Sequence, residues 1–185
     1  MRNIEFKAAC TNAAQFFALL RLAQDAGLQQ SHDMLQSDTY FHAEHGRLKL
    51  RTITEQNSVK HELIGYQRAD STESRLSNYF YYTVPDAGDL KQALAAALSI
   101  DVVVEKHRIV YMYHTTRVHF DDVAQLGYFV ELETVLQNDT TQDEEQLGQN
   151  EHFEVIRLLG LAALQPISGS YRELMLQTQN NYKNP

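Results

Sequence analysis

The 185-residue chain has little of several residue types, and each shortage excludes a class of protein. Its single cysteine, Cys10, cannot form an internal disulfide or supply a cysteine-rich zinc site, so we expect a reducing, cytoplasmic environment. No apolar run approaches the roughly 20 residues of a membrane-spanning helix. Charges at Arg2, Glu5 and Lys7 interrupt the stretch in which a secretion signal needs apolar residues. We therefore expect no membrane partner.

Positive charge is also scarce. The 16 lysines and arginines are outnumbered by 24 aspartates and glutamates, for a formal net charge of −8, which disfavours nucleic acid as a partner. The chain has three prolines, eight glycines and no tryptophan, and 43% of its residues are hydrophobic. This composition is typical of one globular domain, here residues 1–185, and a chain of this size buries roughly 70% of its surface on folding.

Apolar residues at three-to-four spacing predict four helices. The first covers 12–26, with Thr11 or Asn12 as its N-cap and Gly27 as its stop. The others are expected at about 86–99, 141–159 and 170–178. Each helix has an apolar side that needs a surface to pack against.

Between the helices the pattern changes to a period of two and favours β-strands, because these segments are rich in Val, Ile, Tyr, Phe and Thr. The turns between them are short, which favours antiparallel neighbours. Eight strands are about the number that close into a small barrel. We therefore expect an α+β fold, an eight-stranded antiparallel closed β-barrel with helices packed outside. The expected strands are 2–9, 36–43, 46–54, 59–68, 77–84, 101–113, 116–122 and 127–136.

Side chains alternate between the two faces of a strand, so residues two positions apart share a face. In the segment RLKLR, Arg47, Lys49 and Arg51 share one face, opposite Leu48 and Leu50. Six of the expected strands separate charged from apolar residues in this way. The charged faces hold eight basic residues, Lys7, Arg47, Lys49, Arg51, Arg68, Lys106, Arg108 and Arg117, and five acidic residues, Glu5, Glu62, Asp121, Glu131 and Glu133.

Two interpretations of these charged faces are open. They are either the solvated faces of amphipathic strands, as is common in antiparallel sheets, or the lining of a barrel interior. The excess of eight basic over five acidic residues favours the second, because acidic residues predominate in the chain as a whole. The helices also need apolar sheet surface. If the apolar faces carry the helices outside the barrel, the charged faces turn inward.

A charged interior would be unstable if empty, because each unpaired buried charge costs several kcal/mol. Water or a polyanion must therefore fill it. A triphosphate suits such a set, since arginine pairs with two phosphate oxygens and lysine supplies a compact charge. The clustered carboxylates of Glu5, Glu131 and Glu133 would hold Mg²⁺ or Mn²⁺. The pattern predicts metal-assisted chemistry at a phosphoryl or nucleotidyl centre.

The same segments resemble those of the CYTH superfamily, the triphosphate tunnel metalloenzymes, which include class IV adenylyl cyclases, thiamine triphosphatases and inorganic tripolyphosphatases. NIEFK at 3–7 is similar to the E-x-E-x-K strand at the start of that family. The closing GSYREL at 169–174 is similar to the S-Y-x-E-L ending of class IV cyclase relatives. Between them, in the family's order, stand RLKLR at 47–51, GYQRAD at 65–70, EKHR at 105–108, TRVHFD at 116–121 and ELE at 131–133.

The resemblance implies three sets of site residues. The metal ligands would be Glu5, Glu131, Glu133 and Asp121, and the catalytic residues Lys7, Arg117 and Asp121. The phosphate contacts would be Lys7, Arg47, Lys49, Arg51, Arg68, Lys106, Arg108 and Arg117. One position departs from the family pattern, because Asn3 stands where E-x-E-x-K has its first glutamate. An amide oxygen can still ligate a metal, but a second metal would bind less tightly.

The activity that the resemblance implies is metal-dependent conversion of ATP to cyclic AMP and pyrophosphate, with Mg²⁺ or Mn²⁺ as cofactor. Hydrolysis of thiamine triphosphate or of inorganic tripolyphosphate is the alternative reaction. A non-catalytic module that binds polyphosphate or a nucleotide is the alternative of another class, and the Asn3 departure keeps it open. The partner expected in every case is a small molecule that carries a triphosphate, and a homodimer is an open alternative to a monomer.

Other residues with chemical potential have a weaker pattern. His42 and His45 lie at a predicted turn, and a zinc site there is disfavoured. Cys10 has no base beside it in sequence and is interpreted as a small core residue. Tyr66 and Tyr171 are candidates to contact the organic end of the substrate.

Overall fold

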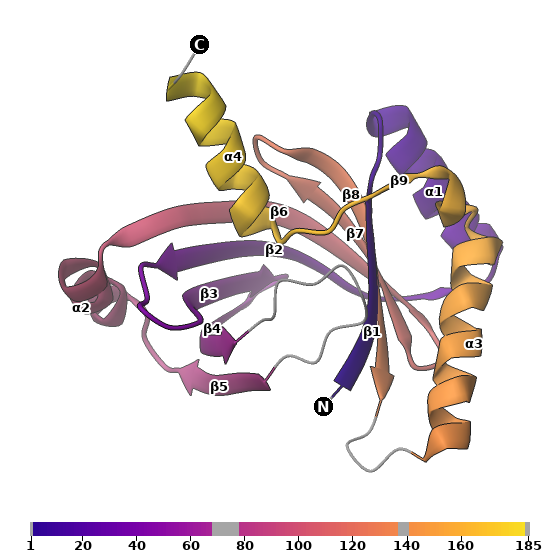
Figure 1. The fold of residues 1–185 in the computed structure, drawn as a ribbon, viewed down its shortest axis with the longest axis horizontal. Helices are drawn as coiled ribbons and strands as arrows, with labels where there is room; N and C mark the ends of the chain where they lie inside the picture. The colour runs from indigo at the N-terminus through magenta and orange to yellow at the C-terminus, as the bar shows by residue number, and fades with distance from the viewer. Residues whose placement is uncertain (1, 68–77, 137–140, 184–185) are drawn as a thin grey trace.

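The computed structural model describes residues 2–67, 78–136 and 141–183, and Figure 1 shows how the elements are arranged. No helix in these ranges is both long and apolar enough to cross a membrane. The elements in chain order are β1 (Arg2–Ala9), α1 (Ala13–Asp25), β2 (Gln29–Phe41), β3 (Arg47–Glu55), β4 (Ser58–Gln67), β5 (Asn78–Val84), α2 (Gly88–Leu98), β6 (Ile100–Tyr113), β7 (Thr116–Val123), β8 (Gly127–Leu136), α3 (Gln142–Leu158), the 3₁₀ turn η1 (Leu161–Ala163), β9 (Gln165–Pro166) and α4 (Tyr171–Lys183).

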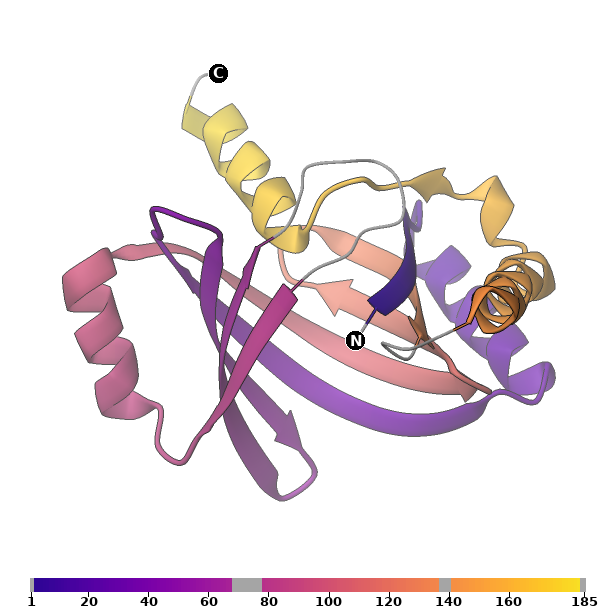
Figure 2. The same cartoon turned by 60° about the horizontal axis from the view of Figure 1, so that its bottom comes forward.

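The strands form one antiparallel sheet in the order β5-β4-β3-β2-β6-β7-β8-β1-β9, so the predicted α+β class is confirmed. The sheet is strongly curved and its concave face forms a trough (Figure 2). It has nine strands rather than the expected eight, and in the described residues β5 and β9 remain as its edges. The predicted closure into a barrel is therefore not confirmed. At the end of β1, the edge that closure would need is occupied by β9, which pairs with Ala8 and Ala9, and by the Ile167 amide, which donates to the Lys7 carbonyl at 2.8 Å.

Local sequence explains the helix boundaries. The side chain of Asn12 caps α1 by accepting from the Gln15 amide at 2.9 Å. Thr141 and Glu144 form a reciprocal capping box at the start of α3. Both helices agree with the predicted ranges to within one residue. The fourth helix runs to Lys183, well beyond the expected end at 178.

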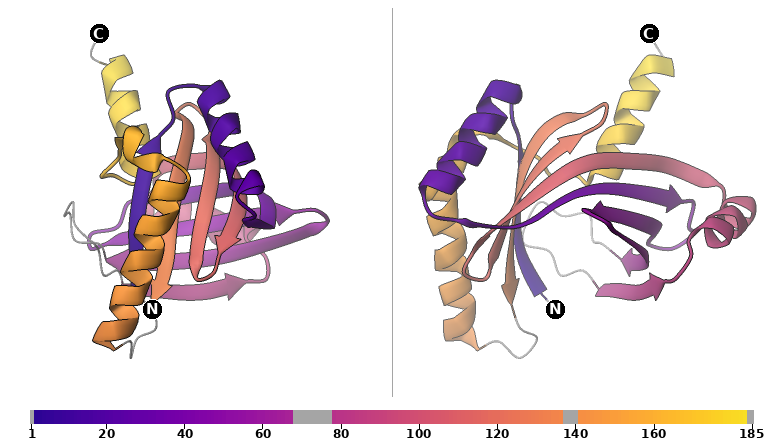
Figure 3. Two further views of the ribbon diagram at one scale, coloured as in Figure 1. Left: turned by 90° about the vertical axis from the view of Figure 1, so that its right-hand side faces the viewer. Right: turned by 180° about the vertical axis from the view of Figure 1, so that it is seen from behind.

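Three helices cover the convex face, as predicted. Figure 3 shows α1 and α3 lying side by side over β1, β7 and β8. Phe16 of α1 and Val155 of α3 are buried there against Phe120, Val130 and Leu132, all of which are at most 3% exposed. On the other arm of the sheet, α2 packs its leucines against Leu50 and neighbouring apolar residues. The apolar strand faces thus carry these helices, and the charged faces turn to the trough.

The fourth helix corrects the prediction that all helices pack outside. Tyr171 and Met175 of α4 pack against Tyr40, Val104 and Phe129, residues that share the concave face with the charged side chains. The physical reason is that the concave face is apolar at this end, so it offers α4 a surface to bury. The helix therefore covers one end of the trough.

Candidate functional site

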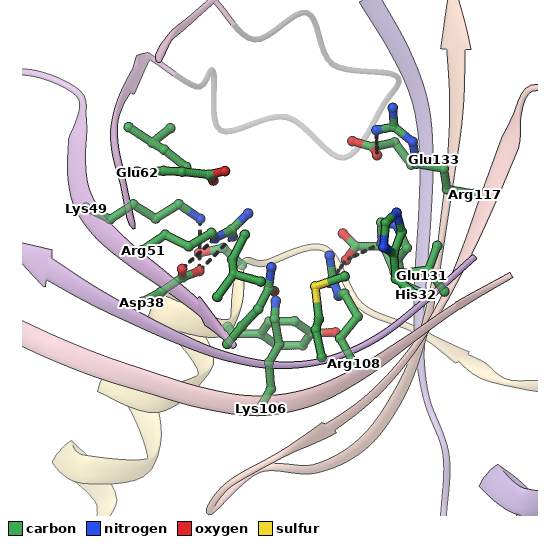
Figure 4. Close-up of a pocket in the computed structure, with 18 of the residues that line it drawn as sticks. His32, Asp38, Lys49, Arg51, Glu62, Lys106, Arg108, Arg117, Glu131 and Glu133 are labelled. Atoms are coloured by element: carbon green, nitrogen blue, oxygen red, sulfur yellow. Dashed lines mark hydrogen bonds and ion pairs between the residues drawn. The ribbon is translucent and has the colours of Figure 1, made fainter. Parts of the chain in front are cut away.

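The concave face encloses a cavity of about 660 Å³, which is within the usual size of small-molecule sites. Every strand from β1 to β8 contributes side chains to it, always from the inward half of its alternation. Figure 4 shows Asp38, Lys49 and Arg51 on one side and Arg117, Glu131 and Glu133 on the other. The charged residues that line it are the cations Lys7, Lys49, Arg51, Lys60, Lys106, Arg108 and Arg117 and the carboxylates Glu5, Asp38, Glu55, Glu62, Glu131 and Glu133.

One side of the cavity is organised by Asp38 on β2. Its carboxylate accepts from Lys49 Nζ at 2.9 Å and from Arg51 Nε and Nη2 at 2.7 and 2.8 Å. Burial opposes ionisation of Asp38, but Arg51 and Lys49 outweigh it and hold the pKa of Asp38 well below its usual value. The carboxylate therefore fixes both cations, which come from β3, with their remaining N–H groups directed into the cavity.

A second group forms around Arg108 on β6. Its Nε donates to Asp121 Oδ1 at 2.6 Å and its Nη2 to Glu131 Oε2 at 2.9 Å. Glu131 also contacts Lys7 Nζ at 3.2 Å, and Asp121 accepts from the Tyr171 hydroxyl at 2.7 Å. Asp121 is completely buried. Through these contacts, Asp121 and Glu131 fix the side chain of Arg108 at the cavity wall, and Glu131 fixes that of Lys7.

The third group lies where β1, β7 and β8 run side by side. Glu5 is directly opposite Glu133 in the β1–β8 register, and Arg117 is opposite Glu133 across β7. Asn3 Nδ2 donates to Glu133 Oε1 at 2.7 Å, and Arg117 Nη1 donates to Glu133 Oε2 at 2.9 Å. The cavity thus has carboxylates concentrated on this side.

The centre of the cavity holds more positive than negative charge. Lys7, Lys49, Arg51, Lys106 and Arg108 are five cations, and the carboxylates that contact them are Asp38, Asp121 and Glu131. Lys106 is 7% exposed, its nearest carboxylate among the described residues is Asp121 at 4.0 Å, and its Nζ lies 4.9 Å from the ring centre of Tyr171. Burial and the neighbouring Arg108 lower the pKa of Lys106 to about 7, and burial and Arg51 lower the pKa of Lys49 to about 8. An anion placed here would relieve this repulsion.

Most of the residues that the sequence nominated meet in this cavity. Nine of them line it: Glu5, Lys7, Lys49, Arg51, Lys106, Arg108, Arg117, Glu131 and Glu133. Asp121 does not line it, because it lies behind Arg108. Arg47 points along the same face to α4, where its Nη2 contacts Glu173 at 2.9 Å. Arg68 lies outside the described residues. The catalytic, phosphate and metal roles of all these residues remain predictions.

Sequence reasoning missed two buried polar residues of β2. Asp38 and Gln36 are 3% and 5% exposed and line the cavity, and neither was nominated. The missed signal was the alternation of Gln36, Asp38 and Tyr40 in QSDTY, which matches the alternation in the neighbouring strands. The tyrosine candidates do line the cavity, and Lys7 Nζ lies 4.3 Å from the ring centre of Tyr171.

The oxygen atoms on the carboxylate side of the cavity are of the kind that a hard divalent cation prefers as ligands. Besides the oxygens of Glu5 and Glu133, this side offers the buried Asn3 Oδ1, which has no hydrogen-bond partner. Within the described ranges no three acidic, histidine or cysteine side chains are already placed to hold a metal. In the described ranges neither His42 nor His45 belongs to such a group of three. His42 contacts Asp101 at 3.6 Å. Cys10 packs beside the outer core, as interpreted, and burial raises its pKa to about 11.

Similarity to known proteins agrees with this geometry. Among solved structures, the PH1012 protein of Pyrococcus horikoshii OT3 aligns with a TM-score of 0.75 and 21% identity over 93% of this chain and 98% of its own. A candidate adenylate cyclase from Vibrio parahaemolyticus aligns with a TM-score of 0.67 and 16% identity, over 95% and 98%. HpAC1 from Hippeastrum, a candidate adenylyl cyclase described as having a dominant triphosphatase activity, aligns with a TM-score of 0.54 and 16% identity, over 86% and 88%.

No curated protein matches the chain. The family model of the CYTH domain matches residues 1–171, which is nearly the whole chain and includes every motif quoted above except the end of GSYREL. The resemblance first seen in the short charged strands is therefore confirmed, and the chain belongs to the CYTH family.

Proposed function

We propose that this protein is a divalent-metal-dependent enzyme that acts on a triphosphate, and that its reaction is the conversion of ATP to cyclic AMP and pyrophosphate. One observation carries the proposal: seven cations and six carboxylates line the cavity, and five of these cations share three carboxylate partners among the described residues, one of which, Asp121, lies behind the cavity. Burying that imbalance costs folding free energy, which a polyanionic ligand would offset. A triphosphate has the charge and the number of acceptor oxygens that these side chains need.

The chain's own residues supply binding and charge neutralisation. Arg51 and Arg108 are each held by a carboxylate through two nitrogens, so their remaining N–H groups are oriented before any ligand arrives. Lys49 and Lys106 add further positive charge beside these two arginines. When the ribose 3′-hydroxyl attacks the α-phosphorus, the bond to pyrophosphate breaks and the hydroxyl proton is released. Cations at this position stabilise the charge that develops on the departing pyrophosphate.

Mg²⁺ or Mn²⁺ would be held on the opposite side by Glu5 and Glu133, with Glu131 and the Asn3 amide oxygen beside them. When bound, the cation would supply Lewis-acid polarisation of the phosphate oxygens. Lys7 contacts Glu131 and Arg117 contacts Glu133, so both cations would lie beside that group, as would Arg108, which also contacts Glu131. We assign Asp121 to holding Arg108 in place, because its two oxygens are already occupied by Arg108 and Tyr171.

Hydrolysis of a triphosphate is the second candidate function. The same cations would serve a reaction in which water is the nucleophile, and the similarity to HpAC1, described as having a dominant triphosphatase activity, favours this candidate. Thiamine triphosphate and inorganic tripolyphosphate are then the alternative substrates. A non-catalytic triphosphate-binding module remains the alternative of another class, since it would use the same cations without turnover.

A substrate panel tests the proposal. ATP, thiamine triphosphate and tripolyphosphate are each incubated with the protein and with Mg²⁺ or Mn²⁺, and cyclic AMP, pyrophosphate and phosphate are quantified. Cyclic AMP from ATP, lost on removal of metal and in Glu133→Ala, is the expected result. Glu44→Ala, at an exposed turn, is the matched control. Phosphate without cyclic AMP would assign hydrolysis, and binding without any product would assign the non-catalytic module.

A further inference from the structure

The cavity wall on β2 and β3 changes character one step away from the Asp38 group. In strand register, Asp38 is opposite Arg51, and the next inward pair is Gln36 opposite Ile53. Met34 follows on β2, and Val110 on β6 lines the same region. The step between successive inward residues on a strand is about 7 Å. Three apolar side chains, Met34, Ile53 and Val110, therefore line this part of the cavity, interspersed with Arg108 opposite Met34 and His32 opposite Val110.

Gln36 lies between Ile53 of β3 and Lys106 of β6 in this part of the cavity. Its side chain is 95% buried, it lines the cavity, and its Oε1 has no hydrogen-bond partner. The described residues offer its Nε2 no hydrogen bond either. A buried amide without partners lowers folding stability, and such groups in native proteins call for a specific explanation. Because none of the described side chains around it supplies that hydrogen bond, Lys106 opposite it on β6 included, the missing partner must come from the cavity.

We propose that Gln36, with Met34, Ile53 and Val110, binds the uncharged heterocycle of the triphosphate substrate. Small-molecule sites typically combine apolar side chains with a few polar groups that fix orientation, and Gln36 with these three apolar side chains offers such a combination. An amide both donates and accepts, so it matches an edge that has an amino group beside a ring nitrogen, as glutamine does with adenine N6 and N7. The aminopyrimidine of thiamine presents an edge of the same chemistry.

The proposal rests on the proposed function, because the heterocycle is positioned by the triphosphate to which it is attached. The phosphates occupy the cations, and the heterocycle lies over β2 and β3 beyond Arg51. Gln36 acts as a specificity residue and not as a phosphate ligand. The cavity then favours an organic triphosphate over tripolyphosphate, and ATP over a nucleotide whose base lacks the amino group.

Calorimetry on the full chain without divalent metal measures binding with no turnover. The ligands are ATP, inosine triphosphate (a carbonyl in place of the amino group), thiamine triphosphate and tripolyphosphate. Wild-type protein is expected to bind ATP on the order of tenfold more tightly than inosine triphosphate, the discrimination of one bidentate amide contact. Gln36→Met is expected to abolish that preference while tripolyphosphate affinity changes less than twofold. Gln29→Met, at an exposed position of the same strand, is the control.

Melting temperature supplies the second readout. Gln36→Met removes a buried amide without a partner and is expected to melt at the same temperature as wild type or higher. The proposal is overturned if wild type binds ATP and inosine triphosphate equally, or if Gln36→Met weakens tripolyphosphate as much as ATP. A preference for thiamine triphosphate that Gln36→Met alone removes would assign the subsite to the aminopyrimidine. If no triphosphate binds wild type, the proposed function itself has failed.

Discussion

Replacing Lys106 with methionine should stabilise the ligand-free protein and weaken its binding of triphosphates. Lys106 is buried on β6, its pKa is lowered from 10.5 to about 7, and its nearest carboxylate is 4.0 Å away. Methionine keeps most of the apolar stem and removes the charge. Asp121 keeps Arg108 and the Tyr171 hydroxyl as partners, so no buried carboxylate is abandoned.

The magnitude follows from the pKa. Between pH 7 and 10.5 the unfolded wild-type chain holds a proton that the folded chain has lost. The free energy of unfolding therefore rises with pH in this window, by up to about 1.4 kcal/mol per pH unit, and the full shift corresponds to about 5 kcal/mol. Lys106→Met lacks this dependence. Its stability advantage should be about 2–4 kcal/mol at pH 6.5 and should disappear toward pH 10.5.

Urea denaturation at several pH values measures this difference, with Lys60→Met as the control because Lys60 is an exposed cation of the same cavity. The control should change stability by less than about 0.5 kcal/mol. Calorimetry should show that Lys106→Met binds tripolyphosphate at least about tenfold more weakly, the loss of one charge-assisted contact. A variant that is less stable than wild type at pH 6.5 and has the same pH slope would mean that the buried charge of Lys106 does not destabilise the folded protein.

Three further results are expected. Tripolyphosphate binding should take up protons near pH 8, because Lys106 and Lys49, with pKa values of about 7 and 8, must be charged to hold it; calorimetry in buffers of different ionisation enthalpy measures this, and buffer-independent heats would contradict it. Glu131→Ala should lower the unfolding free energy by about 1–3 kcal/mol, since it leaves its contacts with Lys7 and Arg108 unmade, whereas Glu133→Ala, which loses an ion pair to the 42% exposed Arg117, should lower it less; equal stabilities in urea would argue against this difference. Asn3→Glu should lower the melting temperature without metal, because it places a second carboxylate against Glu133, and Mn²⁺ should restore it; a melting temperature indifferent to Mn²⁺ would place position 3 away from the metal.

Much of the site could be predicted because one-sided alternation is a local signal. Arg47, Lys49 and Arg51 share a face whatever the fold, and the opposite leucines needed helices to cover them. The start of β2 could not be predicted, since Gln29–Leu35 is polar and exposed and is held to β6 by main-chain pairing with a bulge. Alternation gives no information on such a segment. The first half of β2 also carries Met34. Its second half lies in an expected strand, but the shared face of Gln36 and Asp38 was not recognised there, so neither residue was nominated.

Tertiary contacts account for the remaining differences. Nothing in GSYREL indicates that α4 would enter the concave face, because that depends on Tyr40, Val104 and Phe129 from three distant segments being apolar at the same end. The position of Asp121 relative to the cavity could not be predicted for a similar reason, and its metal-binding and catalytic roles stay predictions. Sequence puts it on the charged face, but only the structure shows that Arg108 and Tyr171 occupy it and that it lies behind the cavity.

The proposed function depends on binding of a triphosphate by the buried cations of the cavity on the concave face. Thermal melting of the wild-type protein in tripolyphosphate, without divalent metal and at constant ionic strength, tests it most directly, because the ligand carries no organic group. The melting temperature should rise with the logarithm of ligand concentration, as for a ligand that binds only the folded state. Arg51→Met, which removes one cation of the Asp38 group, should reduce that rise. A melting temperature that does not move up to millimolar tripolyphosphate would contradict such binding.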